Sequence, residues 1–265
     1  MRSRWIEARR ARPLLGTFVE LALRAPDETI LRRAIALGFN AIAKVQERMN
    51  RHNPLSEVSR LNREAARRGV AVNRSTLTVL RAAERFAEES GGAFDITVGS
   101  AGCWRDLRID EDGRVRFRRP LTIDLGGIAK GFAVDCAVEA LQKAGALSGI
   151  VNAGGDVRVF GDKAESVQIR HPLNPGRSAG SVRLRDRALA TSGCYFTPAL
   201  FDRRTHRAMS DEVSVTVAAP DCLTADALTK VALVLREEGK EMLTRYGADA
   251  FLLEQNFPPR WLSRE

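Results

Sequence analysis

The chain has 265 residues, of which 44% are hydrophobic and 28% charged, a composition typical of a globular protein with a substantial core. No apolar run reaches membrane-spanning length, and the basic segment 1–13 lacks the apolar stretch of a signal peptide, so we expect a cytoplasmic protein without membrane insertion. The net charge of +9 is compatible with nucleic acid or a phosphate-bearing ligand, but no aromatic residues interleave with the arginine runs, and we expect no nucleic-acid partner.

Hydrophobic periodicity predicts a regular series of elements in the first half of the chain. A strand is expected over 14–24, followed by a helix up to Met49 with Asp27 as its N-cap. A helical turn over 56–62 and a helix over 75–90 come next, and Gly91-Gly92 should end the latter.

The second half is predicted to mix helices with hairpin-like strands. Asp112-Gly113 favours a hairpin turn, and a helix should open at the glycines of 126–131 and end near Gly145. Strands are expected over 149–152, 157–160, 167–170, 181–184 and 213–218, then a long helix over 224–246 and a strand over 250–253. This pattern predicts an α+β fold with mixed or antiparallel sheets and packed helices rather than a regular βαβ array.

Three glycine-bearing segments each place backbone amides beside an aspartate, at 91–95, 124–131 and 152–156. The second is the most informative, because glycines that lead into a helix N-terminus can cradle a phosphate and Lys130 in the first turn can neutralise it. It matches neither the Walker A loop nor the GxGxxG pattern. Each segment alone is equally compatible with a tight turn.

Aspartates near helix starts add a second pattern. Asp124 precedes the glycines, and Asp226 lies near the start of the last long helix. Such residues are commonly caps, but their oxygens also suit Mg²⁺ that bridges a pyrophosphate. The histidines His52, His171 and His206 have no triad-like neighbours in the sequence.

Taken in order, these segments resemble the ApbE family of FAD:protein FMN transferases. The most specific strings are Ala93-Phe94-Asp95-Ile96-Thr97-Val98-Gly99 and the run 123–135, which reads IDLGGIAKGFAVD. The resemblance covers nearly the whole chain and implies one two-lobed domain over residues 1–265.

The resemblance implies an activity and a set of site residues. The family splits FAD, links its FMN half to a Thr or Ser of an acceptor flavoprotein subunit and releases AMP, with Mg²⁺ present. The residues implied to bind FAD are His52, Ala93, Phe94, Asp95, Asp124 and Lys130. Those implied for the metal are the Gly127 carbonyl, Asp226 and Thr229.

The chain departs from the family pattern at two places. In the family's His-x-x-Asp-Pro-x-Thr-Gly stretch, Ala199 stands at the His, whereas Asp202 and Thr205 remain and His206 replaces the Gly. The candidate catalytic residues are therefore Asp202, Thr205 and His206.

The second departure is Lys230, which stands where the family has a metal-binding Thr, four residues after Asp226. Its ammonium could neutralise Asp226 and occupy the space of Mg²⁺, or Thr229 could substitute for the missing hydroxyl. These departures leave two functional hypotheses, an active transferase and a catalytically silent FAD-binding or scaffold protein.

Overall fold

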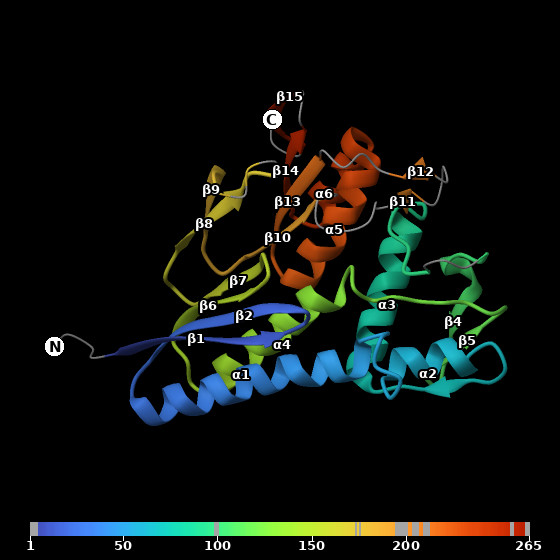
Figure 1. The fold of residues 1–265 in the computed structure, drawn as a ribbon, viewed down its shortest axis with the longest axis horizontal. Helices are drawn as coiled ribbons and strands as arrows, with labels where there is room; N and C mark the ends of the chain where they lie inside the picture. Colours follow the sequence, from blue (N-terminus) through green and yellow to red (C-terminus); the bar gives the residue numbers. More distant parts are fainter. Residues whose placement is uncertain are drawn as a thin grey trace.

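One large antiparallel sheet organises the chain. The computed structural model describes residues 5–97, 101–172, 174, 176–193, 201–202, 207–208, 213–254 and 257–262. Eight strands pair in the order β1-β2-β6-β7-β10-β13-β14-β15, each antiparallel to its neighbour (Figure 1). Their bounds are β1 Ile6–Leu14, β2 Thr17–Ala25, β6 Ser148–Ala153, β7 Asp156–Phe160, β10 Ala188–Gly193, β13 Val213–Ala219, β14 Asp249–Glu254 and β15 Phe257–Trp261.

Three helices cover one face of this sheet. They are α1 (Glu28–Met49), α4 (Ala129–Lys143) and α5 (Cys222–Leu235). Helix α1 packs on β1 and β2, α4 on β6 and β7, and α5 on β10 and β13. The alternation of buried and exposed residues in strand β2 shows why the helices cover this face. Val19, Leu21 and Leu23 are buried towards the helices, whereas Phe18 is 72% exposed.

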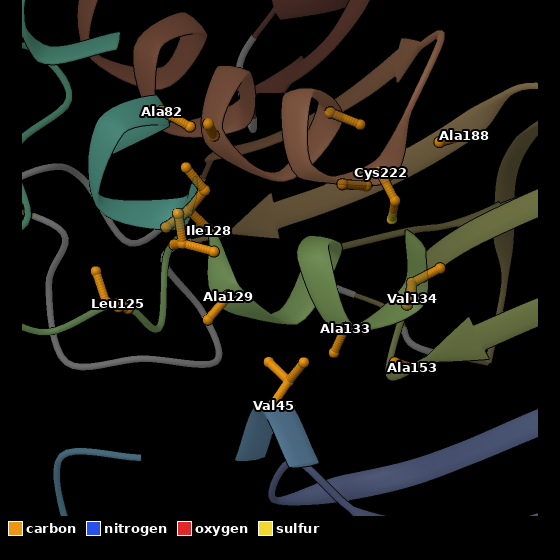
Figure 2. Close-up of a cluster of buried hydrophobic side chains, with 14 of the residues drawn as sticks. Val45, Ala82, Leu125, Ile128, Ala129, Ala133, Val134, Ala153, Ala188 and Cys222 are labelled. Carbon is orange, nitrogen blue, oxygen red and sulfur yellow. The ribbon is translucent and has the colours of Figure 1, made fainter. Parts of the chain in front are cut away.

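Helix α4 occupies the middle of the helical layer, with α1 on one side and α5 on the other. Its small side chains allow this close packing. In Figure 2, Ala129 and Ala133 point towards Val45 of α1, while Cys222 of α5 lies across from Val134. All five are buried in the main hydrophobic cluster.

Most of the remaining elements form a second lobe and two hairpins (Figure 1). The lobe contains α2 (Glu57–Glu64), α3 (Arg74–Glu89), a 3-10 turn (Trp104–Asp106) and the sheet β3 (Val70–Ala71), β5 (Arg114–Phe117), β4 (Leu107–Ile109). The hairpins are β8 (Glu165–Arg170) with β9 (Ser178–Leu184), and β11 (Phe201–Asp202) with β12 (Arg207–Ala208).

The predicted α+β class with antiparallel sheets is confirmed, and Asp27 caps α1 by accepting from the Ile30 N–H at 2.8 Å. The single long helix predicted over 224–246 is wrong. Helix α5 ends at Leu235, where Arg236 takes a φ of +52°, and a 3-10 turn (Arg236–Gly239) and the short α6 (Lys240–Arg245) follow. Strands β1, β10 and β15 were not predicted as strands. The single domain over 1–265 stays a prediction.

Helices α4 and α5 satisfy each other's N-terminal amides, which lack partners within their own helices. The Gly131 N–H of α4 donates to Asp226 of α5 at 3.0 Å. In return, Asp135 of α4 accepts from the N–H groups of Cys222 and Leu223 at 2.9 and 2.8 Å, and it also pairs with Arg158 of β7. A side chain at Gly131 would obstruct this arrangement, because an added Cβ would lie 2.2 Å from the Cys222 carbonyl oxygen.

We therefore expect Asp135→Ala to lower the free energy of unfolding by about 2–4 kcal/mol, because two amides and a guanidinium lose their common partner. Urea denaturation would measure the loss. Glu139→Ala, one turn further along α4 at a side chain that is 65% exposed, is the matched control and should change stability by less than about 0.5 kcal/mol. Equal effects of the two substitutions would contradict the reciprocal capping.

Candidate functional site

The structure brings the three glycine-bearing segments together at the N-terminus of α4. The Asp124 N–H donates to the Ile96 carbonyl at 2.8 Å, and Thr97 forms a β-bridge with Ile123, so the first segment lies beside the second. The third segment joins through Lys130, whose Nζ is 2.9 Å from Asp156 Oδ2. The three segments that stand out in the sequence are therefore neighbours in space.

The FAD-binding residues implied by the resemblance differ in what they offer to a ligand. Asp124 is 30% exposed and pairs with Arg51 at 2.9 Å, and it also accepts from the Gly126 N–H at 2.8 Å. These contacts hold the glycine turn in shape. Asp95 is half-buried, and its Oδ1 accepts from the backbone N–H and the hydroxyl of Thr97, both at 2.8 Å.

Three more of the implied residues, besides Lys130, lie at different depths. His52 is exposed, with its backbone N–H donating to Asn50 Oδ1 at 2.9 Å. Ala93 is half-buried. Phe94 is only 3% exposed and its ring meets Phe86 edge-on at 6.0 Å, so its side chain packs in the core beneath the glycine turn.

Four charged side chains meet where α4, α5 and β7 come together. Asp226 and Asp156 are each 1% exposed, and Lys130 and Lys230 are 29% and 18% exposed. Lys130 pairs with Asp156, and Lys230 pairs with Asp226. We call these four residues the lysine–aspartate cluster; with all four ionised its net charge is zero. Two carboxylates and two ammonium groups buried this deeply require one another as partners.

Asp156 was not among the residues assigned to the site from the sequence. It lies in the third glycine-bearing segment, and its place in that segment was the only sequence feature that could have pointed to a role in the site. Its pairing with Lys130 joins residues 26 positions apart, which no local pattern reveals.

The metal-binding residues implied by the resemblance are close together but do not form a metal site. Lys230 donates to Asp226 Oδ1 and the Gly131 N–H donates to Asp226 Oδ2, so both carboxylate oxygens are engaged. The Thr229 hydroxyl is buried, donates to the Asp226 carbonyl at 2.6 Å and bonds to Ser192 at 2.7 Å. Within the described part of the chain, no group of three or more His, Cys, Asp or Glu side chains could hold a metal ion. A carboxylate already bonded to an ammonium group does not suit Mg²⁺.

The candidate catalytic residues from the sequence fall largely outside the described residues. Thr205 and His206 lie there, as does Ala199. The backbone of Asp202 is described and pairs with Arg207 in the β11–β12 hairpin. The roles of Asp202, Thr205 and His206 therefore stay predictions.

The electrostatics of the lysine–aspartate cluster follow from burial and from the partners. Burial and the nearby Asp226 carboxylate raise the pKa of Asp156 to about 7, against the opposing effect of Lys130 and Lys230. Burial would also raise the pKa of Asp226, but Lys230 and Lys130 outweigh it and hold that pKa below its usual value. Burial would lower the pKa of Lys130, but Asp156 and Asp226 raise it. Protonation of Asp156 removes one negative charge from the cluster.

The fold and the cluster define an α+β protein that presents two lysines and a helix N-terminus at one site, an arrangement suited to a phosphate-bearing ligand. Residues 15–105 and 101–252 match the model of the ApbE family, and the chain belongs to that family. The resemblance found in the sequence is thereby confirmed, and with it the assignment to a family of transferase enzymes.

The comparisons with individual proteins agree with this assignment. The FAD:protein FMN transferase of Vibrio cholerae serotype O1 is 30% identical over 239 residues, covering 74% of this chain and 72% of the relative. That of Treponema pallidum is 29% identical over 313 residues, covering 95% and 86%. The ApbE protein of Thermotoga maritima superposes with a TM-score of 0.84 at 24% identity, covering 99% of this chain and 100% of that chain, which shows the shared fold.

The raised pKa of Asp156 has a testable effect on stability. Because the folded state holds this proton more tightly than the unfolded chain, Asp156 contributes less stability as the pH rises from about 4 towards about 7. We expect the unfolding free energy of the wild type to fall relative to that of Asp156→Asn across this range, by up to about 1.4 kcal/mol per pH unit. Parallel pH profiles in urea denaturation would contradict this. Asp186→Asn, at an exposed turn, should leave the profile unchanged.

Proposed function

We propose that this chain is an FAD:protein FMN transferase that attaches FMN through a phosphoester to a Thr or Ser hydroxyl of an acceptor flavoprotein and releases AMP. The observation that carries the proposal is the lysine–aspartate cluster at the N-terminus of α4, beside the Gly126-Gly127 turn. Two relatives that carry this enzyme name match most of the chain, which supports the same activity here.

The proposed reaction is a substitution at the phosphorus atom of the FMN half of FAD. The acceptor oxygen forms a new bond to that phosphorus, and the bond from the phosphorus to the bridging oxygen breaks. AMP leaves with the bridging oxygen, and the proton of the acceptor hydroxyl is released to water. Because little of this chemistry needs a protein nucleophile, positioning and neutralisation of the phosphate charge supply most of the catalysis.

The described residues support distinct parts of this reaction. Lys130 and the positive end of the α4 dipole would face the pyrophosphate, because both lie directly after the glycine turn. Asp124 and Arg51 would keep that turn in place, and His52 is exposed and accessible to an aromatic ring of the ligand. No step is assigned to Mg²⁺, because the residues around Asp226 do not suit it. Asp202, Thr205 and His206 are proposed to act near the acceptor hydroxyl.

The silent FAD-binding protein remains a second candidate. The contact between Lys230 and Asp226 favours it, since a fixed ammonium group in place of an exchangeable metal is compatible with binding alone. Chromatography for AMP after mixing with FAD and host-cell protein, with a denaturing gel scanned for flavin fluorescence, separates the two. AMP together with a fluorescent protein band supports the transferase. FAD binding without AMP supports the silent protein, and absence of FAD binding by calorimetry rejects both.

We expect Lys130→Met to weaken FAD binding about 10- to 100-fold, because a charge-assisted contact to phosphate contributes roughly 1.5–3 kcal/mol. Calorimetric titration with FAD measures the change. Lys143→Met is the matched control, at an exposed lysine on the same helix that pairs with Glu139, and it should bind FAD like the wild type. If Lys130→Met also bound FAD like the wild type, Lys130 would have no place in the pyrophosphate site.

A further inference from the structure

Lys230 is folded back onto the residue one helical turn before it. Its Nζ donates to Asp226 Oδ1 and, at 3.0 Å, to the Asp226 backbone carbonyl. Because the side chain is only 18% exposed, most of its length is packed against protein. One oxygen of the Asp226 carboxylate therefore accepts from the positively charged Lys230 ammonium group, and the other accepts from the Gly131 N–H.

The path of the Lys230 side chain leads to the glycine turn before α4. A Cβ added at Gly127 would lie 3.3 Å from Lys230 Cε and 3.8 Å from the ring of Phe94. The ammonium end of Lys230 thus occupies the space between Asp226 and the Gly126-Gly127 turn. A cation that bound Asp226 on the side of this turn would therefore meet the Lys230 side chain.

A divalent cation and this ammonium group compete for Asp226. Their positive charges would repel each other strongly at this buried carboxylate, and each of its oxygens already accepts a hydrogen bond. The nearby Lys130 adds a further positive charge. The charge that a divalent cation would bring is instead supplied by the two lysines of the lysine–aspartate cluster.

We propose that Lys230 is the resident cation of this site. Its ammonium group occupies the position beside Asp226 that a divalent metal would take, and it neutralises phosphate charge directly. The chain would then bind a pyrophosphate-bearing dinucleotide without metal. This inference rests on the proposed function for the identity of the ligand, FAD, but its claim about the cation stands on the contacts of Lys230 alone.

The first test uses Mn²⁺ without any flavin, because the electron paramagnetic resonance signal of free Mn²⁺ is lost when the ion binds to protein. We expect the wild type to bind no Mn²⁺ at Asp226. Asp226→Asn should therefore take up as much Mn²⁺ as the wild type. Lys230→Thr, which deletes the ammonium group and leaves a hydroxyl one turn from Asp226, should gain one Mn²⁺ site at Asp226. Uptake of Mn²⁺ by the wild type at Asp226, or no uptake by a folded Lys230→Thr, would overturn the proposal.

The second test uses FAD binding by calorimetry, with EDTA or with Mn²⁺. The wild type should bind FAD equally under both conditions. Lys230→Met should bind at least about 10-fold more weakly under both, because it lacks the ammonium group and offers no metal ligand. Lys230→Thr should need Mn²⁺ to recover its affinity. Loss of wild-type binding in EDTA, or wild-type affinity in Lys230→Met, would overturn the proposal.

The two tests also separate this inference from the proposed function. Thermal melts of each variant establish that it is folded, and Lys143→Met controls for removal of a lysine charge elsewhere on the surface. If no form of the protein binds FAD, the proposed function fails while the Mn²⁺ measurement still decides the role of Lys230. If the wild type binds FAD only with a metal present, the proposed function stands and the role of Lys230 as the resident cation is rejected.

Discussion

The buried carboxylate of Asp226 is the interaction on which the site depends. It is 1% exposed, and in that environment an unpaired charge would be strongly unfavourable. Gly131 of α4 and Lys230 of α5 both donate to it, so one side chain joins the two helices and fixes the position of an ammonium group. The glycine turn, Lys130 and Asp156 are then arranged around this junction.

The large sheet explains why the junction is placed where it is. Each of α1, α4 and α5 covers its own pair of strands, and α4 packs against both α1 and α5, so the N-terminal part of α4 lies against α5. Asp135 completes the link in the other direction by capping α5. Burial raises the pKa of the Asp135 carboxyl despite these amides and Arg158, which is the expected result for a structural carboxylate in a dry contact.

Local patterns were sufficient to predict many of the elements but not the pairings. Helix α1 was predictable because its apolar residues recur at helical spacing behind the Asp27 cap. Strand β1 was not, because an exposed edge strand with Arg9, Arg10 and Arg12 has no alternating apolar face. The end of α5 at Leu235 is not marked by a glycine or proline within the next three residues.

The same distinction holds for the site. Glycine turns and nearby aspartates are visible in the sequence, and so is Lys230, because it lies one helical turn from Asp226. The choice between Lys230 and Thr229 as the partner of Asp226 depended on side-chain direction, which only the structure gives. The contact between Lys130 and Asp156 depends on how β7 packs against α4, and that packing is decided by the whole sheet.

The separation of Gly131 and Asp226 by 95 residues has a consequence for how the protein is made. A ribosome releases the glycine turn, α4 and β7 before α5 emerges, so Lys130 and its partner Asp156 are present in a chain that still lacks Asp226 and Lys230. The lysine–aspartate cluster is therefore complete only late in translation, once α5 has been synthesised.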